Sequence, residues 1–286
     1  MHRLFTSAPF ALLLAAPLAT HAVEITAGTS EYVTFRDCIP GVTACDSISS
    51  IVTGLYGGAP GAYSSAASDS VAGYGSATGN VSFSGVVGAP VLHASAVSMA
   101  GKRTNTNSVA LQSYTYTGGV ATTRTFGATL TYSQLVTGAY PNNNPGVYAT
   151  IDAFTLTASA IDVGSSVESN FDTLFGEGFM ADPSLGYAEV GQSTFADSTT
   201  TPSGLGNLSV TVPLLPGETI WLYVLLQTPA LDGSTVDASH TLVTGWDDAS
   251  DLTPAVISSP VPEPASLALF GLGLAAVGVA RRRRAR

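Results

Sequence analysis

Two groups of aspartates lie in turn-rich segments toward the end of the chain, where they could bind a hard cation. The first group is Asp232 and Asp237, and the second is Asp247, Asp248 and Asp251. Carboxylate oxygens are the ligands that Ca²⁺ prefers, although neither spacing is that of an EF-hand loop. A structural Ca²⁺ is the only cofactor that these residues suggest, and the alternative is that they are solvated turn acids.

Groups that could serve catalysis are few. Only His93 and His240 lie beyond residue 22, too few for a histidine-rich metal site. No G-x-S-x-G sequence is present, the pattern that marks the nucleophile of many serine hydrolases. Four acids that are close in sequence could supply the carboxylate pair of a glycosidase, namely Glu168, Glu177, Asp182 and Glu189. They lie in a loop-rich region where acids are usually solvated, so we expect a protein that is not an enzyme.

Tyrosines in or beside the predicted loops could contact a polysaccharide, because their rings have an apolar body and a polar tip. These residues are Tyr56, Tyr63, Tyr74, Tyr140 and Tyr148. The alternative is that most of them pack against the domain itself.

Cys38 and Cys45 are the only cysteines of the chain. Pro40 and Gly41 between them form a turn pair that can bring the two sulfurs together. A close cysteine pair in an exported protein is expected to form a disulfide. The spacing is not the C-x-x-C of a redox site, so we predict a structural disulfide.

Short runs of β-branched residues, broken by Gly, Pro, Asn and Asp, recur along the chain and predict an all-β fold. We expect strands over residues 31–36, 81–84, 91–99, 108–117, 124–136, 147–161, 208–212, 219–228 and 236–243. Residues 220–226 are apolar on both faces and should form the central strand. Residues 52–79 should form a loop or a strand in close backbone contact, and 170–183 a short helix. The predicted fold class is an antiparallel β-sandwich, either jelly-roll or immunoglobulin-like.

Both ends of the chain have the composition of targeting signals. Residues 1–22 combine Arg3, an apolar run over 10–16 and small residues at the end, which predicts a secretory signal peptide cleaved after Ala22. At the other end, Pro262-Glu263-Pro264 precedes an uncharged run, 265–280, which is followed by Arg281-Arg282-Arg283-Arg284. Such a run predicts a single transmembrane helix of about 24 Å, with the arginines on the cytoplasmic side and the body outside.

This C-terminal arrangement resembles the PEP-CTERM sorting domain. The resemblance rests on Pro262-Glu263-Pro264, on the glycine-bearing stretch 270–274 and on the terminal arginines. It implies recognition by a membrane-embedded exosortase that cuts near the Pro-Glu-Pro element, in a bacterium that makes exopolysaccharide or biofilm. The resemblance covers only the last residues of the chain and transfers no activity to the body.

The predicted organisation is a signal peptide at 1–22, a secreted β-sandwich domain at 23–246, a linker at 247–261 and the sorting signal at 262–286. Between the two signals, 4 basic residues stand against 19 acids, so the body has a net charge near −15. Nucleic-acid binding is excluded, because it requires clustered Lys and Arg.

The function expected from these features is that of an exported, exosortase-sorted surface or matrix protein. Its partners would be the Sec export machinery, the exosortase, the inner membrane through the C-terminal helix before processing, and exopolysaccharide. The body would first lie in the periplasm and then reach the cell surface or the medium. We expect a non-enzymatic structural or binding component, and the alternatives are a carbohydrate-active hydrolase or lyase and a Ca²⁺-dependent adhesin.

Overall fold

The computed structural model describes residues 23–25, 27–37, 46–56, 64–84, 88–137, 144–157, 161–163, 186–198 and 202–254. This part of the chain forms fifteen β-strands, and it contains no helix. It therefore also holds no helix that could cross a membrane. The predicted signal peptide, the helix at 170–183 and the C-terminal sorting segment lie outside the described residues, as do Cys38 and Cys45.

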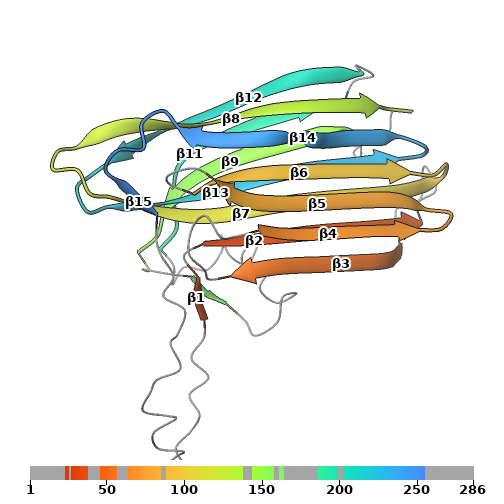
Figure 1. Cartoon of the computed structure of the whole chain (residues 1–286), viewed down its shortest axis with the longest axis horizontal. Coiled ribbons are helices and arrows are strands. Elements are labelled where there is room, and N and C mark those ends of the chain that lie inside the picture. Colours follow the sequence, from red (N-terminus) through yellow and green to blue (C-terminus); the bar gives the residue numbers. More distant parts are fainter. Residues whose placement is uncertain are drawn as a thin grey trace, which may run out of the picture.

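Two antiparallel sheets lie face to face (Figure 1). In spatial order, the seven-stranded sheet contains β11 (Ala188–Asp197), β9 (Val147–Thr155), β13 (Thr219–Leu231), β7 (Lys102–Tyr116), β2 (Ala27–Asp37) and β3 (Asp46–Tyr56), and β15 (Leu252–Pro254) also pairs with β7. The six-stranded sheet contains β12 (Ser203–Leu214), β8 (Thr122–Leu135), β14 (Thr235–Trp246), β6 (Ala89–Ser98), β5 (Gly75–Ser84) and β4 (Ser64–Val71). Separately, β1 (Val23–Ile25) pairs with β10 (Ile161–Val163). The predicted antiparallel all-β body is confirmed.

The chain passes repeatedly from one sheet to the other. From β6 to β9, and again from β11 to β14, each strand lies in the sheet opposite to the strand before it. The two sheets therefore have matching orders, with β12, β8, β14 and β6 in one and β11, β9, β13 and β7 in the other. This winding places β8, β12 and β14 side by side although they are far apart in sequence.

The predicted central strand is confirmed as β13, which lies between β9 and β7. Its alternate side chains point to opposite faces, yet Trp221 and Leu222 are each only 1% exposed. In the other sheet, β8 from Phe126 onward and β12 from Gly206 onward instead alternate between buried and accessible positions, as a strand with one solvated face should.

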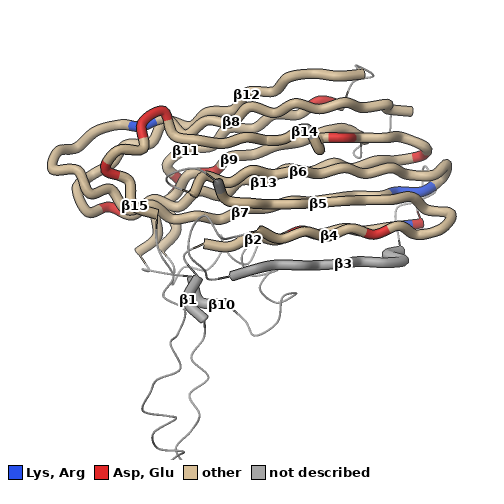
Figure 2. Tube along the Cα trace, viewed as in Figure 1, with Lys and Arg blue, Asp and Glu red and all other residues tan. Residues whose placement is uncertain are grey.

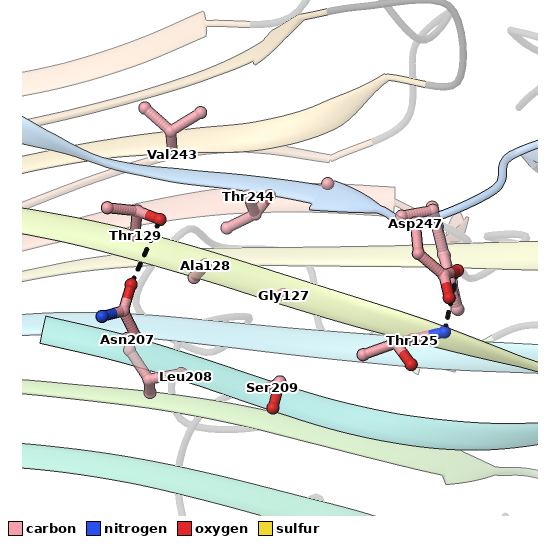
Figure 3. A pocket seen from close by; sticks show the side chains of 12 residues that line it. Thr125, Gly127, Ala128, Thr129, Asn207, Leu208, Ser209, Val243, Thr244 and Asp247 are labelled. Atoms are coloured by element: carbon pink, nitrogen blue, oxygen red, sulfur yellow. Dashed lines mark hydrogen bonds between the residues drawn. The ribbon is translucent and has the colours of Figure 1, made fainter.

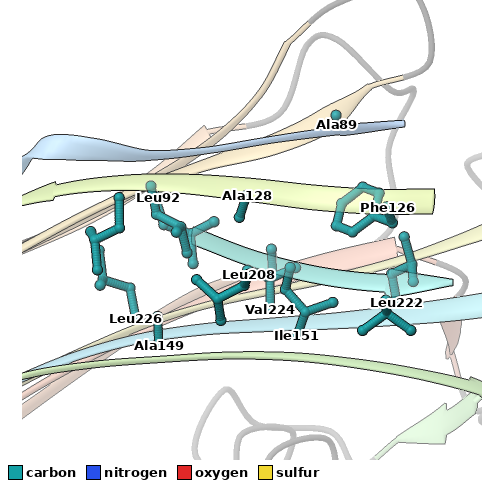
Figure 4. Close-up of a cluster of buried hydrophobic side chains, with 14 of the residues drawn as sticks. Ala89, Leu92, Phe126, Ala128, Ala149, Ile151, Leu208, Leu222, Val224 and Leu226 are labelled. Atoms are coloured by element: carbon teal, nitrogen blue, oxygen red, sulfur yellow. The ribbon is translucent and has the colours of Figure 1, made fainter. Parts of the chain in front are cut away.

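Apolar side chains from both sheets fill the space between them. Figure 4 shows Leu92 of β6 and Phe126 of β8 in the same cluster as Ile151, Leu222 and Val224 from the opposite sheet. None of these five side chains is more than 1% exposed. Full burial of one such side chain contributes roughly 1.5–3 kcal/mol, so this cluster is the main stabilising element of the body.

A second, thinner cluster lies at the side of the sandwich formed by β2, β4 and β5. Here Val33 and Phe35 of β2 pack against Ala67 of β4 and Ala77 of β5. The small alanines allow the sheets to approach closely, and a Cβ added at Gly79 would lie 2.8 Å from Ser108 Oγ of the facing sheet. The segment 52–79, expected as a loop or a closely packed strand, thus contains the end of β3, all of β4 and the start of β5.

The two sheets are also joined by hydrogen bonds. The hydroxyl groups of Thr106 and Ser108 on β7 donate to the backbone carbonyls of Ser95 and His93 on β6, at 2.8 and 2.7 Å. Glu31 is fully buried nearby, and its carboxylate accepts a hydrogen bond of 2.6 Å from Ser65. Buried polar groups need such partners, which explains why this polar interior is compatible with a stable sandwich.

The folded body continues beyond Trp246, the residue at which the sequence places its end. Leu252 of β15 is 6% exposed and pairs with Tyr116 of β7, and the amide of Thr117 donates to the carbonyl of Asp251 at 2.7 Å. Residues 247–254, assigned to the linker from their acids and prolines, are therefore held against the sheet. A linker can begin only after Pro254.

Candidate functional site

An open groove runs across the outer face of the six-stranded sheet, over β12, β8 and β14 (Figure 3). Its floor is a row of three register partners, Ser209 of β12, Gly127 of β8 and Gly245 of β14. Because the two glycines have no side chain, the backbone itself forms the bottom of the groove. We call this site the two-glycine groove, and its volume is about 520 Å³.

The walls of the two-glycine groove contain several polar side chains. On one side lie Asn207, Thr129 and Val243, which form the next row across the same three strands. The Thr129 hydroxyl lies 3.4 Å from the Asn207 carboxamide oxygen, and the side chains of Thr129, Asn207 and Val243 are exposed. The groove thus offers hydroxyl and carboxamide groups on one side, beside one aliphatic contact.

Asp247 and Thr125 form the other wall. The backbone amide of Thr125 donates a hydrogen bond to Asp247 Oδ1 at 2.9 Å. In return, the backbone amide of Asp247 donates to the carbonyl oxygen of Thr125 at 2.9 Å. These bonds fix the carboxylate at the rim of the groove, as the dashed line in Figure 3 shows for the first of them. Trp246 is half-buried behind this wall and packs edge-on against Tyr114 and Phe126, which makes the rim rigid.

The chemistry of the two-glycine groove suits a chain of hydroxylated rings. Sites of roughly 300–1,000 Å³ bind small ligands, and a few fixed polar groups determine how the ligand lies. Here hydroxyl, carboxamide and carboxylate groups flank a flat backbone floor that runs across the strands. Sequence reasoning missed this site, because its floor combines residues from three strands whose pairing only the fold reveals.

The carboxylates of four of the five aspartates considered as cation ligands, Asp232, Asp237, Asp247 and Asp248, accept hydrogen bonds from nearby backbone amides. Asp232 Oδ1 accepts from the amide of Gly101 at 2.7 Å, and Asp237 Oδ1 accepts from that of Ser239 at 2.8 Å. Asp248 accepts from Ser250 at 2.9 Å and forms a 2.9 Å ion pair with Arg124. Asp251 has a φ of +65° in the turn before β15. Within the described residues, no three His, Cys, Asp or Glu side chains come together as a metal site would require.

His93 is bonded to an irregular part of β14. Its Nδ1 lies 2.6 Å from the carbonyl oxygen of Ser239. Because a carbonyl can only accept, this ring nitrogen donates the proton. The register of β14 shifts between Ala238 and Leu242, and Thr241 has a φ of +110°, so His93 supports a bulge. His240 lies in the same bulge, and its side chain is outside the description.

A buried carboxyl group lies on the outer face of the seven-stranded sheet. Asp152 of β9 is 2% exposed and accepts a 3.1 Å hydrogen bond from the hydroxyl of Tyr187, while its Oδ1 has no partner. Burial raises the pKa of Asp152 to about 6, the Tyr187 hydrogen bond opposes this rise, and Glu189 adds to it. Of the four acids considered as a glycosidase pair, Glu189 is the one in the described part of the chain.

Aromatic rings surround this carboxyl group. Tyr187 lies 5.0 Å from the ring of Phe154, and Phe154 stacks on Trp221 at 6.4 Å between centroids. Burial also raises the pKa of Tyr187, with the charge of Asp152 as the next cause. The sequence does place Asp152 and Phe154 on one face of their strand, but the pairing with Tyr187 links residues 35 positions apart.

The tyrosines considered for sugar stacking are engaged within the body where they are described. Tyr74 packs on the second apolar cluster, and the Lys102 ammonium lies 4.7 Å from its ring centroid. The Tyr148 hydroxyl donates to the Asn144 carbonyl at 3.1 Å. Tyr63, Tyr140 and the side chain of Tyr56 are outside the description.

Comparison with known families identifies the end of the chain. Residues 260–284 match the family described as the PEP-CTERM protein-sorting motif, which confirms the resemblance seen at Pro262-Glu263-Pro264. The motif is that of a protein exported and sorted toward the cell surface, and it is recognised by an exosortase. No curated protein matches the chain.

Proposed function

We propose that the body is a non-enzymatic component of the extracellular polysaccharide layer and that it binds a polysaccharide chain in the two-glycine groove. The observation that carries this proposal is the row of Gly127 and Gly245, whose lack of side chains leaves the backbone as the floor of an open groove. A hydroxylated ring can lie on that floor while Thr129, Asn207 and Asp247 bind its hydroxyl groups. The sorting motif supports the proposal, because it directs the protein to the compartment where such a layer lies.

The winding of the chain is a second, weaker support. The order in which β6 to β9 and β11 to β14 pass between the two sheets supports a jelly roll, one of the two fold types expected from the sequence. Lectin domains are among the proteins with this architecture. A fold does not define a function by itself, and the groove rather than the fold carries the proposed function.

Binding to the exopolysaccharide of the producing cells tests the proposal. The exported protein would be purified from those cells and mixed with immobilised exopolysaccharide, with an unrelated acidic β protein as control. We expect retention of the exported protein and none of the control. Equal retention of the exported protein and the control would contradict the proposal.

A carbohydrate-active hydrolase is the second candidate, and one specific observation favours it. The raised pKa of Asp152 and the nearby charge of Glu189 resemble the pairing of a carboxylic acid with a carboxylate in glycosidases. Release of reducing sugar from the exopolysaccharide, lost in Asp152→Asn, would establish that activity. Our leading proposal predicts no release by either protein.

A further inference from the structure

Two arginines face each other on the outer surface of the seven-stranded sheet. Arg36 of β2 and Arg103 of β7 are direct register partners. Their neighbours Phe35 and Thr104 point into the sandwich, so the two guanidinium groups lie on the opposite face. The pairing of β2 with β3 is irregular between Phe35 and Arg36, and such bulges often re-aim side chains beside functional sites.

Neither guanidinium has a hydrogen-bond or ion-pair partner among the described residues, and the Nε atoms of both are buried. The other two basic residues of the body do have partners. Lys102 forms a 2.8 Å ion pair with Asp37, and Arg124 forms the ion pair with Asp248. In a body with 19 acids and 4 basic residues, carboxylates are abundant, and yet no carboxylate among the described residues pairs with either arginine.

The arrangement has an energetic cost. Side chains directly opposite each other on neighbouring strands lie about 4.5–5.5 Å apart at Cβ, and like charges there are destabilising. Burial lowers the pKa of Arg103, and the charge of Arg36 lowers it further. A bound anion would offset this cost, because two guanidinium groups can bind one carboxylate through charge-assisted hydrogen bonds.

The residue next to the pair indicates what kind of anion fits. Asn105, two positions along β7 from Arg103, is 7% exposed and donates from Nδ2 to Asn107 Oδ1 at 2.9 Å. The Oδ1 of Asn105 is buried without a partner and therefore needs a hydrogen-bond donor. A carboxylate alone brings no donor. A sugar that has both a carboxylate and hydroxyl groups provides an anion for the arginines and a hydrogen-bond donor for Asn105.

We infer that Arg36, Arg103 and Asn105 form a binding site for a carboxylate-bearing sugar residue of an acidic polysaccharide. The inference rests on the proposed polysaccharide-binding function and adds a second contact, on the sheet opposite the two-glycine groove. Among the described residues, the basic ones lie only at the two ends of the sandwich, as Figure 2 shows, and Arg36, Lys102 and Arg103 lie at the end where β2 stops and β7 begins. Most other charged residues of the body are acidic, so this pair would bind the carboxylates of the chain, while its uncharged rings would lie in the two-glycine groove.

Titration calorimetry with galacturonate oligosaccharides and with their methyl esters tests the inference on the exported protein. The two probes share their rings and hydroxyl groups and differ only at the carboxyl group, which is an anionic carboxylate in one and a neutral methyl ester in the other. We expect the acid to bind at least about tenfold more tightly than the ester, because it adds two charge-assisted hydrogen bonds. The double variant Arg36→Gln/Arg103→Gln should bind both probes alike, while Arg124→Gln, the matched control, should keep the preference.

Equal binding of acid and ester by the native protein would overturn the inference, and this comparison requires no variant. If the native protein is still retained on its own exopolysaccharide, the proposed function survives that result; if it is not, both fail. Competition by sulfate as strong as that by galacturonate would show a general oxyanion site instead. A change in sedimentation of the double variant, without any effect on sugars, would show that the pair binds a second copy of this chain.

Discussion

Gly245 of β14 lies directly opposite Gly127 of β8, and the space above them is empty of side chains. A Cβ added at Gly245 would have no neighbour within 4 Å, and one added at Gly127 would meet only the Leu208 carbonyl oxygen at 3.5 Å. Neither glycine has a positive φ. The fold would therefore accept larger residues at both positions, and glycine in a strand interior is otherwise unfavourable. What the two glycines do provide is an accessible backbone floor in the groove, as the proposed binding requires.

Gly245→Thr should separate binding from stability. The threonine side chain would fill the two-glycine groove without a clash, so retention on exopolysaccharide should fall at least about tenfold. The free energy of unfolding should stay equal or rise by up to about 1 kcal/mol, because glycine is less favourable than a β-branched residue in a strand. Affinity electrophoresis and urea unfolding measure the two effects.

Gly119→Thr is the matched control for that change. Gly119 lies in the turn between β7 and β8, and a Cβ there also has no neighbour within 4 Å. This variant should keep full binding. If Gly245→Thr binds as well as the native protein, the groove is not the polysaccharide site.

The buried carboxyl of Asp152 predicts a dependence of stability on pH. Its pKa rises from the ordinary 3.8 to about 6 in the folded protein. Below pH 3.8 the group is protonated in both states and has no effect. As the pH rises toward 6, the folded state keeps a proton that the unfolded chain has lost, so the free energy of unfolding falls. Above pH 6 the whole penalty applies, roughly 3 kcal/mol.

Asp152→Asn should remove this penalty, because a carboxamide has no charge and its oxygen can still accept the Tyr187 hydrogen bond. The free energy of unfolding of the variant, minus that of the native protein, should therefore be larger at pH 7.5 than at pH 4. Urea unfolding at the two pH values measures this difference. Asp251→Asn, a change of an exposed acid in a turn, is the control and should show no such trend. If the free energy of unfolding depended on pH in the same way in the native protein and in Asp152→Asn, ionisation of the Asp152 carboxyl would not destabilise the folded state.

The register of the first hairpin bears on the predicted disulfide. Asp37 ends β2 and Asp46 begins β3, and the two residues are register partners. Cys38 and Cys45 are the next residues on either side of the connection. The disulfide stays a prediction, and for a loop this short it should contribute roughly 2–3 kcal/mol.

Alkylation before and after reduction measures the oxidation state of the two cysteines. We expect no reaction of the exported protein without reductant, and a lower melting temperature for Cys38→Ser/Cys45→Ser than for the native protein. Two alkylated thiols without reductant would show that the predicted disulfide is absent.

The sequence predicts those parts of this protein that depend on local composition. The long β-branched runs gave the strands β7, β8 and β13, and the apolar run from Ile220 identified the central position of β13 correctly. The sorting motif was recognisable because its three parts follow each other directly. Each of these signals is contained within a single segment of about ten to twenty-five residues.

The missed features depend on contacts between distant segments. Strand β4 is composed largely of serine and alanine, which have little β preference, and it forms because its Ala67 fits between two closely spaced sheets. The hydrogen bond from Tyr187 to Asp152 and the glycine row require the register of the folded sheets. β15 forms because Leu252 finds a buried position beside Tyr116, although its acidic and proline-rich surroundings resemble a linker.

The arginine pair makes a prediction about stability that is independent of any ligand. Arg103→Gln removes one of two like charges on neighbouring strands, so in the absence of ligand the free energy of unfolding should rise by roughly 0.2–1 kcal/mol at low salt. The gain should shrink as salt is added, because a short Debye length screens the repulsion that the variant relieves. Arg124→Gln loses the ion pair with Asp248 and should give no gain. If Arg103 were present only to stabilise the fold, its replacement would lower the free energy of unfolding. A loss of stability in ligand-free Arg103→Gln would therefore mean that the arginine pair stabilises the sheet and is not a site for an anion.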